Sequence, residues 1–255
     1  WKYKISASNS DFDFVEYGPN AYPSLLYNAM VNPLVGLSMR GVIWYQGENN
    51  TNRAKEYYHL FPAMINDWRK KWGKDFPFYW VQLANYMDAV EVPSESLWAQ
   101  VREAQTQTLS LSHTGQAVII DIGEAKDIHP KNKQEVGRRL ALHALHNDYG
   151  FSDVVCESKT VRRVQDKIAV QFDNVADGLI VKNKYGYLMS FAVAGNDGVY
   201  KWVQAKVAGK DRVVLSCPDV IDPVSVRYAW GDNPDDANLY NSVGLPATPF
   251  EIKIE

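Results

Sequence analysis

The chain has 255 residues, of which 46% are hydrophobic and 22% charged, a composition typical of a globular protein that buries a sizeable core. Its net charge of −3 provides no basic field and argues against a nucleic-acid partner. No apolar run approaches the roughly 20 residues of a membrane span, and the histidines and cysteines lack metal-ligand spacing. We therefore expect no membrane partner and no zinc site.

The first part of the chain, up to about Gly150, alternates short apolar runs with segments in which apolar side chains recur every three or four residues. The short runs predict strands at 39–45, 76–83 and 117–122. The periodic segments predict helices at 57–72, 97–109 and 131–149. Gly150 is a natural stop for the last helix.

Strands that alternate with helices predict an α/β layer with a parallel sheet over residues 1–150. Functional residues of such sheets gather just beyond the carboxyl ends of the strands. Two polar clusters fall there: one over 46–49 after the first strand, the other over 121–129 after the third. These two clusters are the candidates for a functional site.

From about Phe151 the pattern changes to short strands separated by turn residues. Strands are predicted at 167–172, 188–194, 199–207, 212–216 and 224–230. Glycine-rich turns at 195–198 and 209–211 predict hairpins between them. Residues 151–255 are therefore expected to form a small antiparallel β domain, similar to a β-sandwich, packed on the α/β layer.

Asp127-Ile128-His129-Pro130 lies in the predicted loop between the third strand and the third helix. A serine hydrolase needs an imidazole to accept the hydroxyl proton and a carboxylate to orient that imidazole. His129 and Asp127 could supply both groups. The alternative is a surface loop in which the aspartate only caps the next helix.

Gln46-Gly47-Glu48 forms the second candidate cluster. The Gln46 amide is a neutral donor suited to a developing oxyanion, and Gly47 lets backbone approach a ligand closely. Alternatively, this is a strand-end turn with solvated side chains, or Glu48 pairs with Asp121 or Glu124 as the two carboxylates of a glycoside hydrolase.

The remaining aromatic, histidine and arginine residues are expected to be structural. The 8 tryptophans and 15 tyrosines are attributed mainly to packing. The other histidines are expected at the surface, in or beside helices: His59, His113, His143 and His146. Arg138-Arg139 is expected to be solvated.

A series of segments in the same order along nearly the whole chain resembles the sialate O-acetylesterase family, which belongs to the SGNH-type serine esterases. The resemblance includes GVIWYQGENN at 41–50, WAQVREAQ at 98–105 and DIHPKNKQEVGRRLALHAL at 127–145. Further matching segments lie at 26–34, 66–69, 76–78, 81–83, 121–124, 226–230, 238–241, 244–246 and 249–250.

The resemblance implies a flavodoxin-like, SGNH-hydrolase-like sheet and the removal of acetyl esters from an O-acetylated sugar or glycan through an acyl-enzyme. It assigns His129 as general base, Asp127 as its acid partner and Gln46 to the oxyanion hole, with Gly47 and Glu48 shaping the site. It implies no metal or organic cofactor. It also implies a periplasmic, extracellular or lysosomal location.

Two features depart from the family pattern. The acid of many such esterases lies three residues before the histidine, where this chain has Lys126, so Asp121 or a backbone carbonyl is an alternative to Asp127. The family's early Gly-Gln-Ser-Asn-like nucleophile motif is absent, and Ser38 lacks its neighbours.

The missing nucleophile leads us to expect a sheet that is incomplete at its N-terminal side. The opening WKYKISASNS does not resemble a signal peptide. We expect an N-terminal fragment or chain to supply the serine, and this chain alone to be inactive. The alternative from another class is a non-catalytic carbohydrate-binding or structural module.

Overall fold

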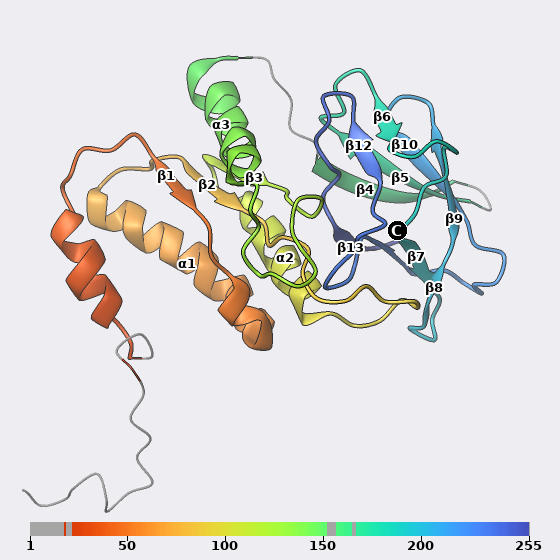
Figure 1. The fold of residues 1–255 in the computed structure, drawn as a ribbon, viewed down its shortest axis with the longest axis horizontal. Coiled ribbons are helices and arrows are strands. Elements are labelled where there is room, and N and C mark those ends of the chain that lie inside the picture. The colour runs from red at the N-terminus through yellow and green to blue at the C-terminus, as the bar shows by residue number, and fades with distance from the viewer. Residues whose placement is uncertain (1–17, 19–21, 152–156, 165–166, 255) are drawn as a thin grey trace, which may run out of the picture.

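The computed structural model describes residue 18 and residues 22–151, 157–164 and 167–254. The opening ten residues and Cys156 lie outside these described residues. The described chain combines a parallel sheet, flanked by helices, with antiparallel sheets (Figure 1). The predicted mixed α/β class is therefore confirmed.

The parallel sheet has three strands in the order β1-β2-β3. These are β1 (Val42–Trp44), β2 (Phe78–Val81) and β3 (Thr114–Ala117). Both neighbouring pairs are parallel, as expected when helices connect successive strands. The carboxyl ends of the strands thus share one edge of the sheet.

The main helices are α1 (Ala54–Trp72), α2 (Leu97–Gln107) and α3 (Lys133–Tyr149). Short helical turns are η3 (Tyr27–Val31), η4 (Asn32–Leu34), η5 (Glu48–Arg53) and η6 (Thr108–Ser110). The predicted stop at Gly150 is confirmed: it follows α3 with φ +74°, a conformation that glycine adopts without steric cost. None of the described helices is long and apolar enough to span a bilayer.

Helices cover both faces of the parallel sheet. Side chains alternate along β2, so this strand contributes to the core on each face. Phe78 and Trp80 pack in a core with α1 and α2, whereas Tyr79 and Val81 pack in another core that α3 covers. All four side chains are buried. The alternation therefore makes a three-layer arrangement in which β2 is the central strand.

The remaining strands are antiparallel and form two four-stranded sheets and a two-stranded one. The first sheet contains β4 (Glu157–Val164), β5 (Lys167–Asp173), β10 (Arg212–Ser216) and β9 (Gln204–Ala208). The second contains β13 (Phe250–Lys253), β11 (Ser225–Tyr228), β7 (Phe191–Ala194) and β8 (Tyr200–Trp202). The pair is β12 (Leu239–Asn241) with β6 (Leu179–Val181).

The two four-stranded sheets share one apolar core, as sheets packed face to face do. Val170 of β5 and Val213 of β10 contribute from one sheet, and Val193 of β7 and Val226 of β11 from the other. All four have no solvent-exposed surface. This core also includes Val118 and Ile120, which follow β3, so the α/β layer and the antiparallel strands are joined by apolar packing.

Two strand predictions were wrong in position or number. The third parallel strand spans Thr114–Ala117 rather than 117–122, because its pairing with β2 ends at Val81↔Ala117. Beyond it, Val118 and Ile120 pack in the core of the antiparallel sheets. The single strand predicted at 199–207 is two strands, β8 and β9, which belong to different sheets.

The surface placement of two side chains was also wrong. His143 is 3% exposed, stacks on Tyr79 and lies with Nε2 2.6 Å from the carbonyl oxygen of Gln116. Arg139 is 5% exposed and bonded to carboxylates. Sequence periodicity could not show either burial, because β3 and the antiparallel part supply the covering surfaces.

Candidate functional site

The first polar cluster lies directly after β1, where η5 starts. Gly47 is buried and has φ +153°. Residues other than glycine adopt this backbone conformation only with strain. A Cβ atom there would lie 3.1 Å from Leu83 Cδ2 and 3.2 Å from Gln105 Nε2. The glycine therefore allows the chain to turn tightly against β2 and α2 before Glu48.

Gln46 is held on both its main chain and its side chain. Its carbonyl oxygen accepts a hydrogen bond from Gln105 Nε2 at 3.2 Å. Its Oε1 accepts one from the Tyr57 hydroxyl at 3.1 Å, and its Nε2 donates to Asn50 Oδ1 at 2.8 Å. A primary amide has two N–H groups. The contact with Asn50 uses one of them and fixes the orientation, and no other described residue is bonded to Nε2.

His129 and Asp127 lie in the loop between β3 and α3. Asp127 Oδ1 accepts the backbone N–H of His129 at 2.9 Å, and this bond is the main reason that the pKa of Asp127 is lowered. The same oxygen is 3.6 Å from His129 Nδ1, longer than a hydrogen bond. The imidazole is 85% exposed, so Asp127 fixes the loop more than the ring.

The two polar clusters meet at one cavity of about 350 Å³. The residues that line it are Tyr45, Gln46, Glu48, Asn49, Ile128, His129, Pro130 and Lys133. The fold thus brings together three of the predicted site residues, Gln46, Glu48 and His129, from segments about 80 positions apart. Gly47 and Asp127 are not among the described residues that line it, and neither is any serine.

One wall of the cavity is formed by Tyr45 and Lys133. Lys133 Nζ lies 4.7 Å from the centre of the Tyr45 ring, a favourable cation–π arrangement. Burial raises the pKa of the Tyr45 hydroxyl, and the charge of Glu48 raises it further. Tyr45 is therefore neutral at pH 7 and does not act as an anion in the site.

The two other carboxylates considered from the sequence are engaged elsewhere. Asp121 binds Arg139 through both oxygens, at 2.5 and 2.9 Å. Glu124 Oε2 accepts from Lys131 Nζ at 2.8 Å. These contacts give Asp121 and Glu124 roles in holding the loop that leads to His129.

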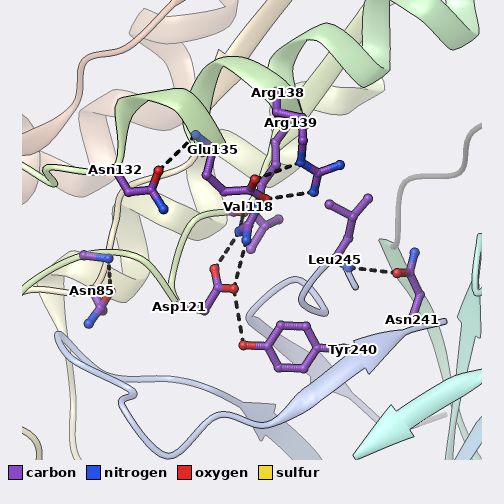
Figure 2. A network of polar contacts seen from close by, with 11 residues as sticks. Asn85, Val118, Asp121, Asn132, Glu135, Arg138, Arg139, Tyr240, Asn241 and Leu245 are labelled. Carbon is purple, nitrogen blue, oxygen red and sulfur yellow. Dashed lines mark hydrogen bonds and ion pairs between the residues drawn. The ribbon is translucent and has the colours of Figure 1, made fainter. Parts of the chain in front are cut away.

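Figure 2 shows the network around Asp121 and its surroundings. Arg139 of α3 lies between Glu135 and Asp121, and the Tyr240 hydroxyl donates to Asp121 Oδ2 at 3.3 Å. Tyr240 belongs to β12, so the antiparallel part of the chain contacts the start of the His129 loop. The sequence offered no local signal for this contact.

The same loop is also tied to the loop after β2. Asn85 Oδ1 accepts the backbone N–H of Gly123 at 2.8 Å, while Asn85 Nδ2 donates to Asn233 Oδ1 at 2.9 Å. A Cβ atom on Gly123 would lie 2.3 Å from the Asn85 carbonyl oxygen. Gly123 and Asn85 are thus supporting residues that sequence reasoning missed, although Gly123 lay within the recognised segment 121–124.

Together, the fold and the cavity define a mixed α/β protein with a polar site at the carboxyl edge of a parallel sheet. The family model described as carbohydrate esterase, sialic acid-specific acetylesterase matches residues 12–146. The chain belongs to this family.

Relatives and a solved structure are similar over most of the chain. Sialate O-acetylesterase of Rattus norvegicus is 29% identical over 94% of this chain and 50% of its own length, and that of Homo sapiens is 30% identical over 91% and 49%. The crystal structure of a carbohydrate acetylesterase from Xanthomonas citri has a TM-score of 0.85 and 44% identity, covering 91% of this chain and 55% of that one. The chain thus spans about half the length of these relatives.

Proposed function

We propose that this chain is the histidine-bearing part of an esterase that removes acetyl groups from sugar hydroxyls through a serine acyl-enzyme. The observation that carries the proposal is the shared cavity, which brings His129 to the same space as Gln46 and Glu48. Membership of the acetylesterase family and the acetylesterase names of its relatives support the reaction type. The substrate is an O-acetylated sialic acid, as for a sialate 9-O-acetylesterase, or an acetylated polysaccharide.

In this mechanism His129 is the general base. It accepts the proton of a serine hydroxyl as the serine oxygen attacks the acetyl carbonyl carbon, and then gives that proton to the departing sugar oxygen. Water, activated by the same imidazole, next cleaves the acyl-serine bond and releases acetate. The high exposure of His129, 85%, leaves its ring accessible to a serine supplied from outside the chain.

Gln46 would stabilise the oxyanion that forms on the acetyl carbonyl oxygen. Its second N–H is the donor, and the bonds to Asn50 and Tyr57 hold the amide in place before substrate arrives, which is what electrostatic stabilisation of a transition state requires. Gly47 and Glu48 shape the adjacent wall.

Asp127 is proposed as the acid partner of His129. Its carboxylate is 3.6 Å from Nδ1, so a small side-chain rotation on substrate binding would form the hydrogen bond that orients the ring. Because the pKa of Asp127 is lowered, this carboxylate is ionised at neutral pH and favours the imidazolium that develops during the reaction.

The nucleophilic serine is proposed to come from an N-terminal region that completes an SGNH-like sheet beside β1. Among the described strands β1 pairs only with β2, and Ile43 in β1 is 71% exposed. An unpaired edge with an exposed apolar side chain favours pairing with a further strand. We also propose that residues 1–150 form an α/β domain and residues 151–255 a β-sandwich-like domain.

The test measures p-nitrophenyl acetate turnover by this chain alone and after co-expression with the part of the Xanthomonas citri acetylesterase that this chain does not cover. We expect no turnover by the chain alone and robust turnover by the pair. His129→Ala should reduce the activity of the pair by about 10⁴-fold or more, as losses of triad members do. His113→Ala is the matched control, because His113 is also exposed and also lies near an aspartate, 3.8 Å from Asp75.

Two results would contradict the proposal. Robust turnover by this chain alone that disappears in His129→Ala would place the serine within it. Full activity of the His129→Ala pair would remove the general-base role of His129.

A further inference from the structure

A second and larger cavity, of about 650 Å³, lies in the antiparallel part of the chain. It is formed where the loop between β2 and α2 meets β8, β9 and the segment before β7. In Figure 1 this loop, drawn in yellow, extends toward β7 and β8. The volume falls within the range of small-molecule binding sites.

The rim of this cavity carries two exposed aromatic rings. Tyr187 is 64% and Trp202 is 42% exposed, and both line the cavity. Trp202 Nε1 donates to the carbonyl oxygen of Glu91 at 2.9 Å, which fixes the indole while leaving much of it in solvent. The carbonyl oxygen of Tyr187 accepts from Asn183 Nδ2 at 2.6 Å and from Asn238 Nδ2 at 2.8 Å, so its backbone is also held.

Polar groups accompany these rings. Asp236 and Gln204 are exposed and line the cavity. Ser190 is 6% exposed with φ +63°, and its hydroxyl donates to the Asp236 carboxylate. This bond holds one carboxylate oxygen toward Ser190, and the other can accept from a ligand hydroxyl.

The charges around the cavity identify the class of ligand. Its lining includes two acidic residues, Glu91 and Asp236, and one basic residue, Lys206. Two negative charges against one positive disfavour an anionic ligand. Aromatic rings with nearby carboxylate and amide groups instead match a ligand that has apolar C–H faces and a ring of hydroxyl groups.

We propose that this cavity binds a neutral oligosaccharide, with sugar rings packed on Trp202 and Tyr187 and hydroxyls bonded to Asp236 and Gln204. The site goes beyond the proposed esterase function, since it requires neither the serine nor His129. Its loop begins at the carboxyl end of β2, the same sheet edge that bears the His129 cavity. A glycan bound here would therefore be retained on the same chain as the proposed ester site.

The test titrates this chain with cellohexaose, xylohexaose and mannohexaose, following heat by calorimetry and tryptophan fluorescence. We expect at least one of these sugars to bind. Trp202→Ala should weaken that binding by about tenfold or more, because losing a stacked aromatic surface costs on the order of one factor of ten in affinity. Gln204→Ala, an exposed position on β9, should weaken it without affecting the fold.

Matched controls separate this site from the esterase site. Tyr149→Ala removes a tyrosine that is 59% exposed at the end of α3 and should leave binding unchanged, as should His129→Ala. Lactose should bind at least as well as sialyllactose. The proposal is overturned if none of the three neutral hexasaccharides binds, if binding survives both Trp202→Ala and Tyr187→Ala, or if sialyllactose binds more tightly than lactose.

Discussion

Arg139 on α3 binds Asp121, just beyond β3, through two parallel hydrogen bonds of 2.5 and 2.9 Å. The arginine side chain is 5% exposed and the aspartate 14%. The same guanidinium donates to the carbonyl oxygen of Val118 at 2.7 Å and to Glu135 at 2.8 Å. A single buried cation therefore connects α3 with the first residues of the His129 loop.

Replacing this cation should be costly. Arg139→Gln leaves Asp121 buried without its partner, and breaking a buried pair in this way typically lowers the free energy of unfolding by about 3–5 kcal/mol. Arg138→Gln is the matched control: Arg138 also binds Glu135 but is 48% exposed, and exposed pairs contribute about 1 kcal/mol or less. Urea denaturation measures both, and equal losses would contradict the assigned role of Arg139.

Gly47→Ala should destabilise the chain by about 1–3 kcal/mol, the usual cost of forcing a side chain into an unfavoured backbone conformation. The added Cβ also crowds Leu83 and Gln105. Gly137→Ala provides the opposite case, since Gly137 lies within α3 and a Cβ added there would have nothing within 4 Å beyond the helix's own backbone. That variant should gain about 0.4–1 kcal/mol, and thermal unfolding of both would check the contrast.

The buried His143 should make stability depend on pH. Burial lowers its pKa to about 4, whereas an unfolded histidine titrates near about 6.5. Between these values the unfolded chain binds a proton that the folded chain does not, so the free energy of unfolding falls as the pH drops from about 6.5 to 4.

This dependence, at most about 1.4 kcal/mol per pH unit, should be absent in His143→Gln. Urea midpoints between pH 7 and pH 4 measure the slope. His59→Gln removes an exposed histidine of α1 and should keep the wild-type slope. A slope that His143→Gln leaves unchanged would show that another group is responsible.

Among the described strands β1 pairs only with β2, and its other edge provides a test of the proposed sheet completion. Ile43→Lys should leave the stability of this chain nearly unchanged, because the side chain is 71% exposed. It should weaken association with the complementing fragment of the co-expression test by about tenfold or more, since burying an isoleucine contributes about 1.5–3 kcal/mol. Ile221→Lys, at an 85% exposed position of the antiparallel part, should leave association unaffected in a co-purification assay.

The helices and the mixed fold class could be predicted because their signals are local. Apolar spacing and Gly150 defined α3, and the fully apolar run 78–81 defined β2. The third strand could not be placed correctly because its burial depends on distant partners. Gln116 in β3 is 1% exposed, and its Oε1 accepts from Trp80 Nε1 at 3.0 Å, so a polar residue occupies a position that the sequence pattern assigns to the surface.

The candidate site was predictable to a similar extent. Gln46 and His129 each follow a strand of the same parallel sheet, which was enough to expect them at one edge. The residues that support their loops were not predictable, since Asn85 and Asn233 meet across 148 positions and Asp121 and Tyr240 across 119. Contacts of that range follow from how the antiparallel strands dock, which no local pattern encodes.

Arg102 in α2 has no exposed surface. In the described part of the chain, every hydrogen-bond acceptor of its guanidinium is a main-chain oxygen. It donates to Leu83 and Ala84 after β2, and to Gly231 and Asp232 after β11, at 2.6–2.9 Å. Because the acceptors are backbone atoms, these four hydrogen bonds do not themselves require particular side chains at the acceptor positions. A chimera that joins this α/β layer to the antiparallel part of a relative therefore needs the loops after β2 and β11 to keep their backbone geometry around Arg102. Comparing the residue identities in these loops would not show whether that geometry is kept.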